Sequence, residues 1–181
     1  MPTPPESNWH GTEDRPNNFG PVAANYEKYR SQYPSTLASE VLEAVSLPNN
    51  ASLLEIRSGT GRATRLFTER GFDITCIEPI AEMASIARDI NGDDQGISYV
   101  HSTFEDWSPP AGPYDLVFSG QAFHWVDPDT GYQKLANVLR PGGVAALFWY
   151  TPALANPQLV QAIDRIYTDL APEIGGRIYQ P

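Results

Sequence analysis

Two glycines in one short turn and an acidic residue seventeen positions later carry the clearest chemical pattern of this chain. Gly59 and Gly61 follow the apolar segment 52–56, and Glu78 follows a second apolar segment, 73–77. Glycine adopts backbone angles that other residues avoid, and it lets a ligand approach the main chain closely. A carboxylate at the position of Glu78 can accept hydrogen bonds from both ribose hydroxyls of a nucleoside. The spacing therefore predicts a site for a nucleoside-type ligand.

The elements that must position these residues alternate between short apolar runs and helical patterns. We expect strands at 52–56, 73–77, 97–100, 114–119 and 144–149. The pattern predicts a helix over 62–70, whose N-terminus near Gly61 would direct its positive dipole end at an anionic group. Further helices are expected at 19–33, which carries Tyr26 and Arg30, at 36–47 with Ser35 as cap and at 79–90. The pattern also predicts helices at 128–139, with Asp127 as cap and Tyr132 facing inward, and at 156–170. Such alternation indicates a mostly parallel α/β sheet with right-handed crossovers.

Two nucleoside-containing ligands fit a turn of this kind, a dinucleotide and S-adenosylmethionine. A dinucleotide turn reads G-x-G-x-x-G, whereas Arg57 and Arg62 flank the two glycines here. A dinucleotide oxidoreductase is therefore the weakest of three hypotheses.

The stretch S-L-L-E-I-R-S-G-T-G-R resembles motif I of the class I S-adenosylmethionine-dependent methyltransferases, which reads acidic-x-Gly-x-Gly-x-Gly. Glu55, Gly59 and Gly61 match the motif, and Glu78 stands at the ribose position. The resemblance implies a three-layer Rossmann-like sandwich and S-adenosylmethionine as cofactor. Arg57 replaces the first glycine of the motif, which in the family lies against the methionine end of the cofactor. Arg57 either obstructs the cofactor or pairs with its carboxylate, a bond worth roughly 1.5 to 3 kcal/mol.

Other segments resemble the small-molecule branch of this family, which includes the trans-aconitate methyltransferases. The resemblance implies that Tyr26 and Arg30 lie over the cofactor, although the same helix can simply pack aromatic side chains on the core. It also implies that the cofactor is contacted by Pro79, by Gln121 and by the adenine loop residues Thr103, Phe104 and Glu105. His124 is the candidate general base, because imidazole titrates near neutral pH; alternatively it only lines the pocket. No metal site is expected.

Composition limits the other function classes. Twelve Lys and Arg against 22 Asp and Glu give a net charge of −10, which argues against binding to nucleic acid or to anionic membranes. The single cysteine, Cys76, reads as a small apolar residue. The sequence shows no secretion signal or membrane-spanning run, so we expect a cytoplasmic protein.

The domain organisation follows from these patterns. Residues 1–18 are proline-rich and polar and are expected to form a flexible arm, and residues 19–181 a methyltransferase-like domain. The closing C-terminal strands of the family's sheet have no match here, so the fifth strand would be an exposed edge. A second copy forming a homodimer, another chain or a longer gene product would cover it. The favoured function is methyl transfer to the oxygen or carboxylate of a small molecule. The alternative is a catalytically impaired domain that acts as a partner-binding or regulatory module.

Overall fold

The computed structural model describes residues 20–92, 96–109, 113–150 and 156–170. The arm predicted at 1–18 lies outside these residues. The chain divides into two compact units, one that ends at Phe148 and one that begins at Trp149. All elements of the site described below belong to the first unit.

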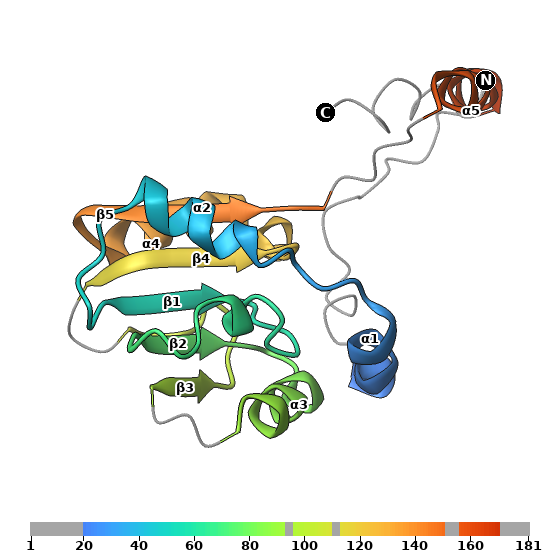
Figure 1. Cartoon of the computed structure of the whole chain (residues 1–181). Coiled ribbons are helices and arrows are strands. Elements are labelled where there is room, and N and C mark those ends of the chain that lie inside the picture. The colour runs from blue at the N-terminus through green and yellow to red at the C-terminus, as the bar shows by residue number, and fades with distance from the viewer. Residues whose placement is uncertain (1–19, 93–95, 110–112, 151–155, 171–181) are drawn as a thin grey trace. The chain divides into compact units, whose positions relative to one another are not determined.

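A five-stranded parallel sheet forms the centre of the first unit. Its strands run in the order β3-β2-β1-β4-β5, and their arrowheads in Figure 1 point the same way. The strand bounds are β1 Ser52–Ile56, β2 Asp73–Ile77, β3 Ile97–Val100, β4 Tyr114–Gly120 and β5 Leu139–Phe148. This confirms the predicted α/β architecture. The chain reverses direction across the sheet between β1 and β4, and ligands of such sheets bind at this switch point.

Helices cover both faces of this sheet. Their bounds are α1 Ala23–Tyr29, α2 Thr36–Ala44, α3 Ala81–Asn91 and α4 Pro128–Val138, and the second unit contains α5 Pro157–Leu170. In Figure 1 α2 lies in front of the sheet, α4 behind it, and α1 at the arrowhead end. The side chain of Asp127 accepts a hydrogen bond from the backbone of Asp129 and caps α4, as predicted.

The prediction of a helix over 62–70 is wrong. Only a 3-10 turn, η2 Thr64–Leu66, forms there, with hydrogen bonds from Leu66 to Ala63 and from Phe67 to Thr64. The sequence pattern is misleading because residues 61–64 are all buried and thus lack the solvent-facing side of an ordinary helix. A regular helix therefore does not point its N-terminus at the glycine turn, and the dipole argument for an anion is lost.

Two smaller expectations also fail. Ser35 has helical backbone angles and makes no side-chain cap bond to α2. Tyr132 was expected to face inward from α4 but is 59% exposed, because Gly131, Leu135 and Val138 form the buried stripe of that helix.

Side chains of alternating strand residues form one apolar cluster on each face of the sheet. On β1, Leu54 belongs to the cluster that includes Val138 of α4, and Leu53 belongs to the cluster that packs against α2. Both leucines are fully buried. The sheet is thus held from both sides, and the loops that follow its strands stand on a rigid base.

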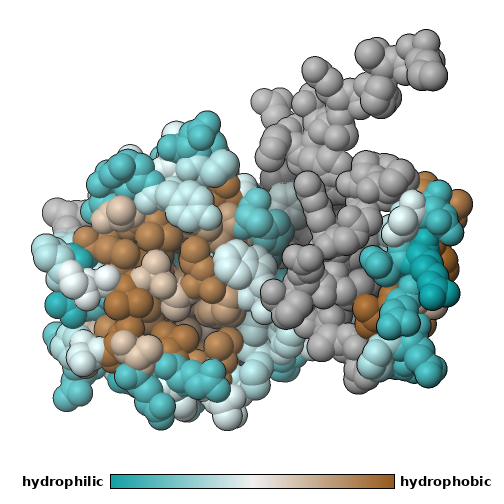
Figure 2. All heavy atoms as spheres, turned by 90° about the horizontal axis from the view of Figure 1, so that it is seen from above, coloured by the Kyte–Doolittle hydropathy of each residue, from teal (hydrophilic) through white to brown (hydrophobic). Residues whose placement is uncertain are grey.

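The outer side of β5 is the open edge of the sheet. Looking onto this edge, Figure 2 shows apolar side chains gathered along it between hydrophilic borders. Several apolar residues of β5 are only half-buried, namely Val144, Ala146, Leu147 and Phe148. An edge of this kind is a template for pairing with another strand. A homodimer through this edge stays a prediction.

Candidate functional site

The carboxylate of Glu78 ties the glycine turn to the beginning of α3. The backbone N–H of Gly59 donates to one oxygen at 2.7 Å, and that of Ile80 donates to the other at 2.9 Å. Burial raises the pKa of Glu78, although the two backbone hydrogen bonds and the charge of Arg57 oppose the shift. Each carboxylate oxygen keeps a further lone pair, so Glu78 can still accept a hydrogen bond from a ligand hydroxyl.

The two glycines of the turn are needed for different reasons. Both adopt left-handed backbone angles, with φ of 58° at Gly59 and 76° at Gly61. A Cβ on Gly59 would meet only the sulfur of Met83, at 3.8 Å, so a ligand can approach there. A Cβ on Gly61 would come within 2.7 Å of the side-chain nitrogen of Asn91 and 3.2 Å of the Cβ of Ala87. Gly61 therefore lets α3 pack closely against the turn.

Glu55 lies beneath the turn, inside the core. Only 2% of it is exposed, its carboxylate accepts a hydrogen bond from the hydroxyl of Thr64, and the thiol of Cys76 lies 3.8 Å away. Burial without a bonded cation raises the pKa of Glu55 to about 8. Such a side chain supports the shape of the turn from below.

A carboxylate that the sequence analysis missed fastens α1 to the far end of the turn. Glu27 accepts hydrogen bonds from Arg62 at 2.9 Å, from Arg65 at 3.0 Å and from the hydroxyl of Thr60. Arg62 donates in addition to the backbone oxygens of Glu27 and Arg30. Partial burial acts to raise the pKa of Glu27, but the hydroxyl and the two guanidinium groups hold it below its ordinary value. We call Glu27, Thr60, Arg62 and Arg65 the clamp.

Tyr26 and Arg30 lie on the same helix as Glu27. The ring of Tyr26 packs against a cluster that joins α1 to α3 and includes Ile80 and Met83. The exposed guanidinium of Arg30 stands 5.9 Å from the centre of that ring. These contacts suit the packing interpretation of Tyr26, and the cofactor roles of both residues stay predictions.

The loop after β3 offers one carboxylate to the site. The Phe104 side chain is fully buried in the core, and the Thr103 hydroxyl is engaged with Asp106. One oxygen of Glu105 accepts a hydrogen bond from the backbone of Asp127 at 2.8 Å, while the other is buried without a partner. Of Thr103, Phe104 and Glu105, Glu105 therefore has a side-chain atom without a partner.

The loop after β4 carries Gln121 and His124. Gln121 has a φ of 59°, and its side-chain nitrogen is buried without a hydrogen-bond partner. His124 lies in the 3-10 turn η3 Phe123–Trp125, and its ring is 5.2 Å from that of Trp125. Burial and the charge of Arg57 lower the pKa of His124. The imidazole is therefore neutral at neutral pH, the form in which it can accept a proton.

Pro79 holds a neighbouring loop in place. Its carbonyl oxygen lies 2.9 Å from Nε2 of His101, which follows β3. This contact joins the ends of β2 and β3, so Pro79 contributes to the site through its backbone.

Arg57 stands in the middle of these loops. The register pairs Ile56 with Ile77, so Arg57 and Glu78 are the first residues beyond a paired position. The φ of Arg57 is 57°, in the region that favours glycine, and its Nε is buried without a partner. Burial lowers the pKa of Arg57, and the charges of Glu78 and Glu105 oppose that shift.

Besides Nε of Arg62 in the clamp, four buried polar atoms lack a hydrogen-bond partner in the described loops that follow β1, β3 and β4. They are Nε of Arg57, Oγ of Ser58, Oε2 of Glu105 and Nε2 of Gln121. Buried polar groups of folded proteins are nearly always hydrogen-bonded, so such a group of orphaned atoms indicates a place for a polar ligand. Both donors and acceptors are present, which suits a nucleoside with hydroxyl groups and ring nitrogens.

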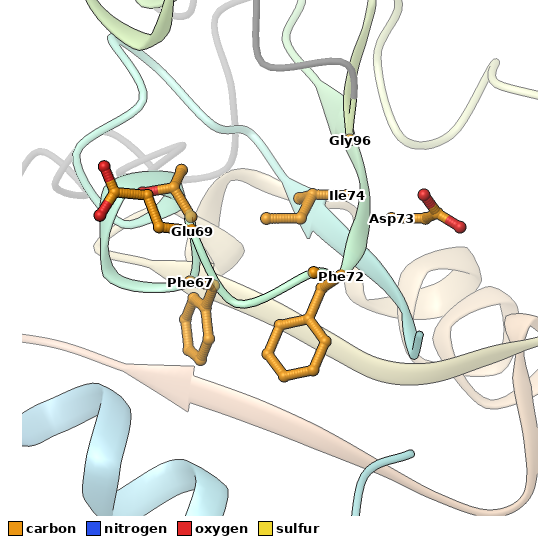
Figure 3. A pocket seen from close by; sticks show the side chains of 8 residues that line it. Phe67, Glu69, Phe72, Asp73, Ile74 and Gly96 are labelled. Atoms are coloured by element: carbon orange, nitrogen blue, oxygen red, sulfur yellow. The ribbon is translucent and has the colours of Figure 1, made fainter. Parts of the chain in front are cut away.

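A cavity of about 220 Å³ lies at the opposite end of β2 (Figure 3). Its lining includes Phe67, Phe72 and Ile74, and in the figure the carboxylates of Glu69 and Asp73 point away from one another. It is thus at the amino ends of the strands, away from Glu78 and from the orphaned atoms. We assign the candidate site to the strand-end loops on chemistry, since none of the orphaned atoms lines this cavity.

The described residues contain no group of three or more His, Cys, Asp and Glu side chains that could hold a metal ion. Within the same part of the chain, no helix has the length and apolar character needed to cross a bilayer.

A family model described as a methyltransferase domain matches residues 54–147. The uncharacterized methyltransferase Rv3342 of Mycobacterium tuberculosis is 34% identical over 134 residues, which are 74% of this chain and 52% of that protein. The malonyl-[acyl-carrier protein] O-methyltransferase of Salmonella typhimurium is 31% identical over 129 residues, 71% of this chain and 50% of the relative. The chain spans about half the length of the curated relatives it matches.

Solved structures agree in fold. A complex of DhpI with S-adenosylhomocysteine superimposes with a TM-score of 0.62 at 26% identity. The match covers 77% of this chain and 69% of DhpI.

Proposed function

This chain belongs to the methyltransferase domain family, a class I S-adenosylmethionine-dependent group, and we propose that it transfers a methyl group from that cofactor to a small molecule. The favoured acceptor atom is an oxygen, in a carboxylate or a hydroxyl group.

The observation that carries this proposal is the anchored carboxylate of Glu78. It follows β2 directly, is fixed by the backbone N–H groups of Gly59 and Ile80, and keeps lone pairs free for ribose hydroxyls. The orphaned side-chain atoms of Ser58, Glu105 and Gln121 supply further partners for the nucleoside. These residues fit the polar part of S-adenosylmethionine.

The chemistry divides simply between ligand and protein. S-adenosylmethionine supplies a methyl group that is activated by a positively charged sulfur. The chain's own residues bind the cofactor, orient the acceptor and exclude water, because displacement at a methyl carbon requires an in-line approach of the nucleophile. Glu78 and Glu105 would fix the nucleoside end, and the loop with Gln121 and His124 would face the acceptor.

His124 is the proposed general base for a hydroxyl acceptor. Partial burial and the charge of Arg57 lower the pKa of this imidazole, so it is neutral and can take the hydroxyl proton as the oxygen attacks. A carboxylate acceptor is already an anion and needs no base. Replacement of His124 by Asn would therefore slow methylation of hydroxyl acceptors and leave that of carboxylates nearly unchanged.

Support for a carboxylate acceptor comes from relatives. The Salmonella relative bears the name of an O-methyltransferase of malonyl-[acyl-carrier protein], and malonyl groups carry a free carboxylate. We infer the same acceptor class for this chain.

The alternative is a domain that binds partners or regulates without moving a methyl group. One observation favours it, because the bulky Arg57 side chain occupies a position next to Glu78 where the family motif has glycine.

The deciding experiment measures transfer of labelled methyl groups from S-adenosylmethionine to malonate esters, short dicarboxylates and hydroxy acids. Glu78→Ala should abolish both transfer and binding of S-adenosylhomocysteine by calorimetry. Asp89→Ala removes an exposed carboxylate of α3 and serves as the matched control. Transfer that survives in Glu78→Ala would overturn the assignment of the site, and binding without transfer to any acceptor would favour the regulatory alternative.

A further inference from the structure

Lys134 of α4 contacts the loop that follows β3, although it belongs to none of the loops of the candidate site. Its ammonium group donates hydrogen bonds to the backbone oxygens of Glu105, at 2.8 Å, and of Trp107. The same nitrogen lies 5.4 Å from the ring centre of Phe104 and 6.0 Å from that of Trp107. One charged side chain therefore holds the main chain on both sides of Asp106.

The side chain of Glu105 is fixed by the beginning of the same helix. Its Oε1 accepts a hydrogen bond from the backbone of Asp127 at 2.8 Å, and Asp127 is the capping residue of α4. Its Oε2 is buried and has no hydrogen-bond partner. The backbone of Glu105 is thus attached to α4 through Lys134, and its carboxylate through Asp127. The position of Oε2 therefore depends on this helix as well as on the loop.

Packing and charge have separate roles in this loop. The buried rings of Phe104 and Trp107 belong to the apolar cluster that includes Leu135 of α4. Apolar burial is not directional, so it holds the loop on the core without orienting its peptide groups. Hydrogen bonds from a charged donor are directional, and they are stronger than those between neutral groups. Without Lys134 the loop should therefore stay on the core, while the peptide groups next to Glu105 lose their orientation.

The surroundings of Lys134 suit a cationic donor. Burial lowers the pKa of its ammonium group, and the charges of Glu105 and Asp106 oppose this shift. An ammonium group has three donors and no acceptor, which matches a pair of carbonyl oxygens. A guanidinium group also has donors only, so arginine is the conservative replacement at this position.

We propose that Lys134 is a positioning residue of the candidate site, which holds the loop after β3 so that Oε2 of Glu105 can accept a hydrogen bond from a bound nucleoside. The inference rests on the proposed function, in which Glu105 fixes the nucleoside end of S-adenosylmethionine. Lys134 does not contact the ligand and acts through Glu105. Its loss should therefore raise the Kd of the ligand only while the carboxylate of Glu105 is present.

The test is a double-mutant cycle between Lys134 and Glu105, with the Kd of S-adenosylhomocysteine measured by calorimetry. Lys134→Met removes the charge and keeps most of the length of the side chain, and Lys134→Arg keeps the charge and the donors. Glu105→Gln keeps one oxygen for the backbone of Asp127 and replaces the other by an amide nitrogen, which cannot accept. Lys28→Met is the matched control, because Lys28 is an exposed lysine of α1.

Lys134→Met should raise the Kd about tenfold, which lies within the usual range of coupling between contacting residues. Glu105→Gln should raise it by about as much, and adding Lys134→Met to Glu105→Gln should change it by less than about twofold. Lys134→Arg should restore most of the affinity, and Lys28→Met should leave the Kd unchanged.

An equal rise of the Kd with and without Glu105→Gln would show that Lys134 acts on the whole fold, and it would overturn the inference. An unchanged Kd in Lys134→Met or in Glu105→Gln would overturn it as well. If Lys134→Met does not fold, Lys134→Gln, which keeps a neutral donor, takes its place in the cycle with the same expected dependence on Glu105. Each of these outcomes leaves the proposed function intact. Failure of the unchanged chain to bind S-adenosylhomocysteine would instead overturn the proposed function and this inference together.

Discussion

Charged side chains at the two ends of the glycine turn differ in whether they have an ion-pair partner. The near end adjoins β1, and the far end adjoins η2. At the far end, Arg62 and Arg65 are neutralised by Glu27 through ion pairs of 2.9 Å and 3.0 Å. At the near end, neither Arg57 nor the buried Glu55 forms an ion pair within the described residues. The comparison teaches that charges within one short segment can serve different purposes. Paired charges hold α1 against the sheet, and unpaired ones are left to act on a ligand or on protonation.

Breaking the clamp should have a large effect on stability. Glu27→Gln leaves Arg62, only 5% exposed, without its carboxylate, and an uncompensated buried charge of this kind costs about 3 kcal/mol. The free energy of unfolding, measured by urea titration, should fall by that amount. Glu43→Gln, at an exposed position of α2, is the control and should change it by less than about 0.5 kcal/mol.

A double variant sharpens this result. Glu27→Gln combined with Arg62→Met removes both charges, so part of the loss should be recovered. Equal losses in Glu27→Gln and Glu43→Gln would contradict the role given to the clamp.

The buried Glu55 at the near end should make the free energy of unfolding depend on pH. The pKa of Glu55 rises from 4.5 to about 8 on folding, because the carboxyl group is buried. The folded protein therefore holds this proton more tightly than the unfolded chain. The stabilisation is complete below pH 4.5 and is lost as the pH rises toward 8. The loss is limited to about 1.4 kcal/mol per pH unit for one proton.

Urea titrations across this pH window check the expectation. The difference in unfolding free energy between the unchanged chain and Glu55→Gln should shrink steadily as the pH rises. Glu78 shifts in the same direction, but it is present in both proteins and cancels in the difference. Parallel curves for the two proteins would mean that Glu55 is ionised in the folded state.

The smallest effect has the opposite sign to the first. Arg57→Gly relieves a left-handed backbone conformation and removes a poorly solvated cation, and it should stabilise the fold by about 1 kcal/mol. Glu69→Gly is the matched control, because Glu69 has a similar φ of 61° but an exposed side chain. The difference between the two substitutions isolates the cost of the partly buried guanidinium. Destabilisation by Arg57→Gly would show that the charge is better compensated than the contacts indicate.

Local signals in the sequence predicted most of the fold. The bounds of β1, β2 and β3 agree because each apolar run is closed by a glycine, proline or polar residue whose backbone preference is strong. The cap at Asp127 followed from the adjacent Pro128 for the same reason. These features depend only on neighbouring residues.

The failures depend on contacts between distant residues. The segment 62–70 has helical composition, yet the burial of Arg62 and the bond between Thr64 and Glu55 hold it as a turn. Glu27 was missed because its partners lie 33 to 38 residues away and a glutamate in a helix usually faces solvent. In the sequence, the available signal was two arginines three residues apart, Arg62 and Arg65, which would need an acidic partner if they were buried.

The same limit applies to the candidate site. Spacing pointed to Glu78 and to Gly59, which the structure joins by a hydrogen bond. Spacing could not reveal that Gly61 serves helix packing or that Phe104 is wholly buried. Such distinctions require the positions of α3 and α4.

The rate at which the single cysteine of the chain is chemically modified can report how often the core opens. Cys76 is fully buried in the middle of β2, and burial raises the pKa of its thiol well above the ordinary value, so thiol reagents cannot modify it in the closed molecule. Modification must therefore wait for the strand to be exposed, and its rate measures how often that happens. Ligands that bind at the turn should slow the reaction in proportion to their occupancy. The unlabelled protein thus provides its own screen for molecules that stabilise this half of the sheet.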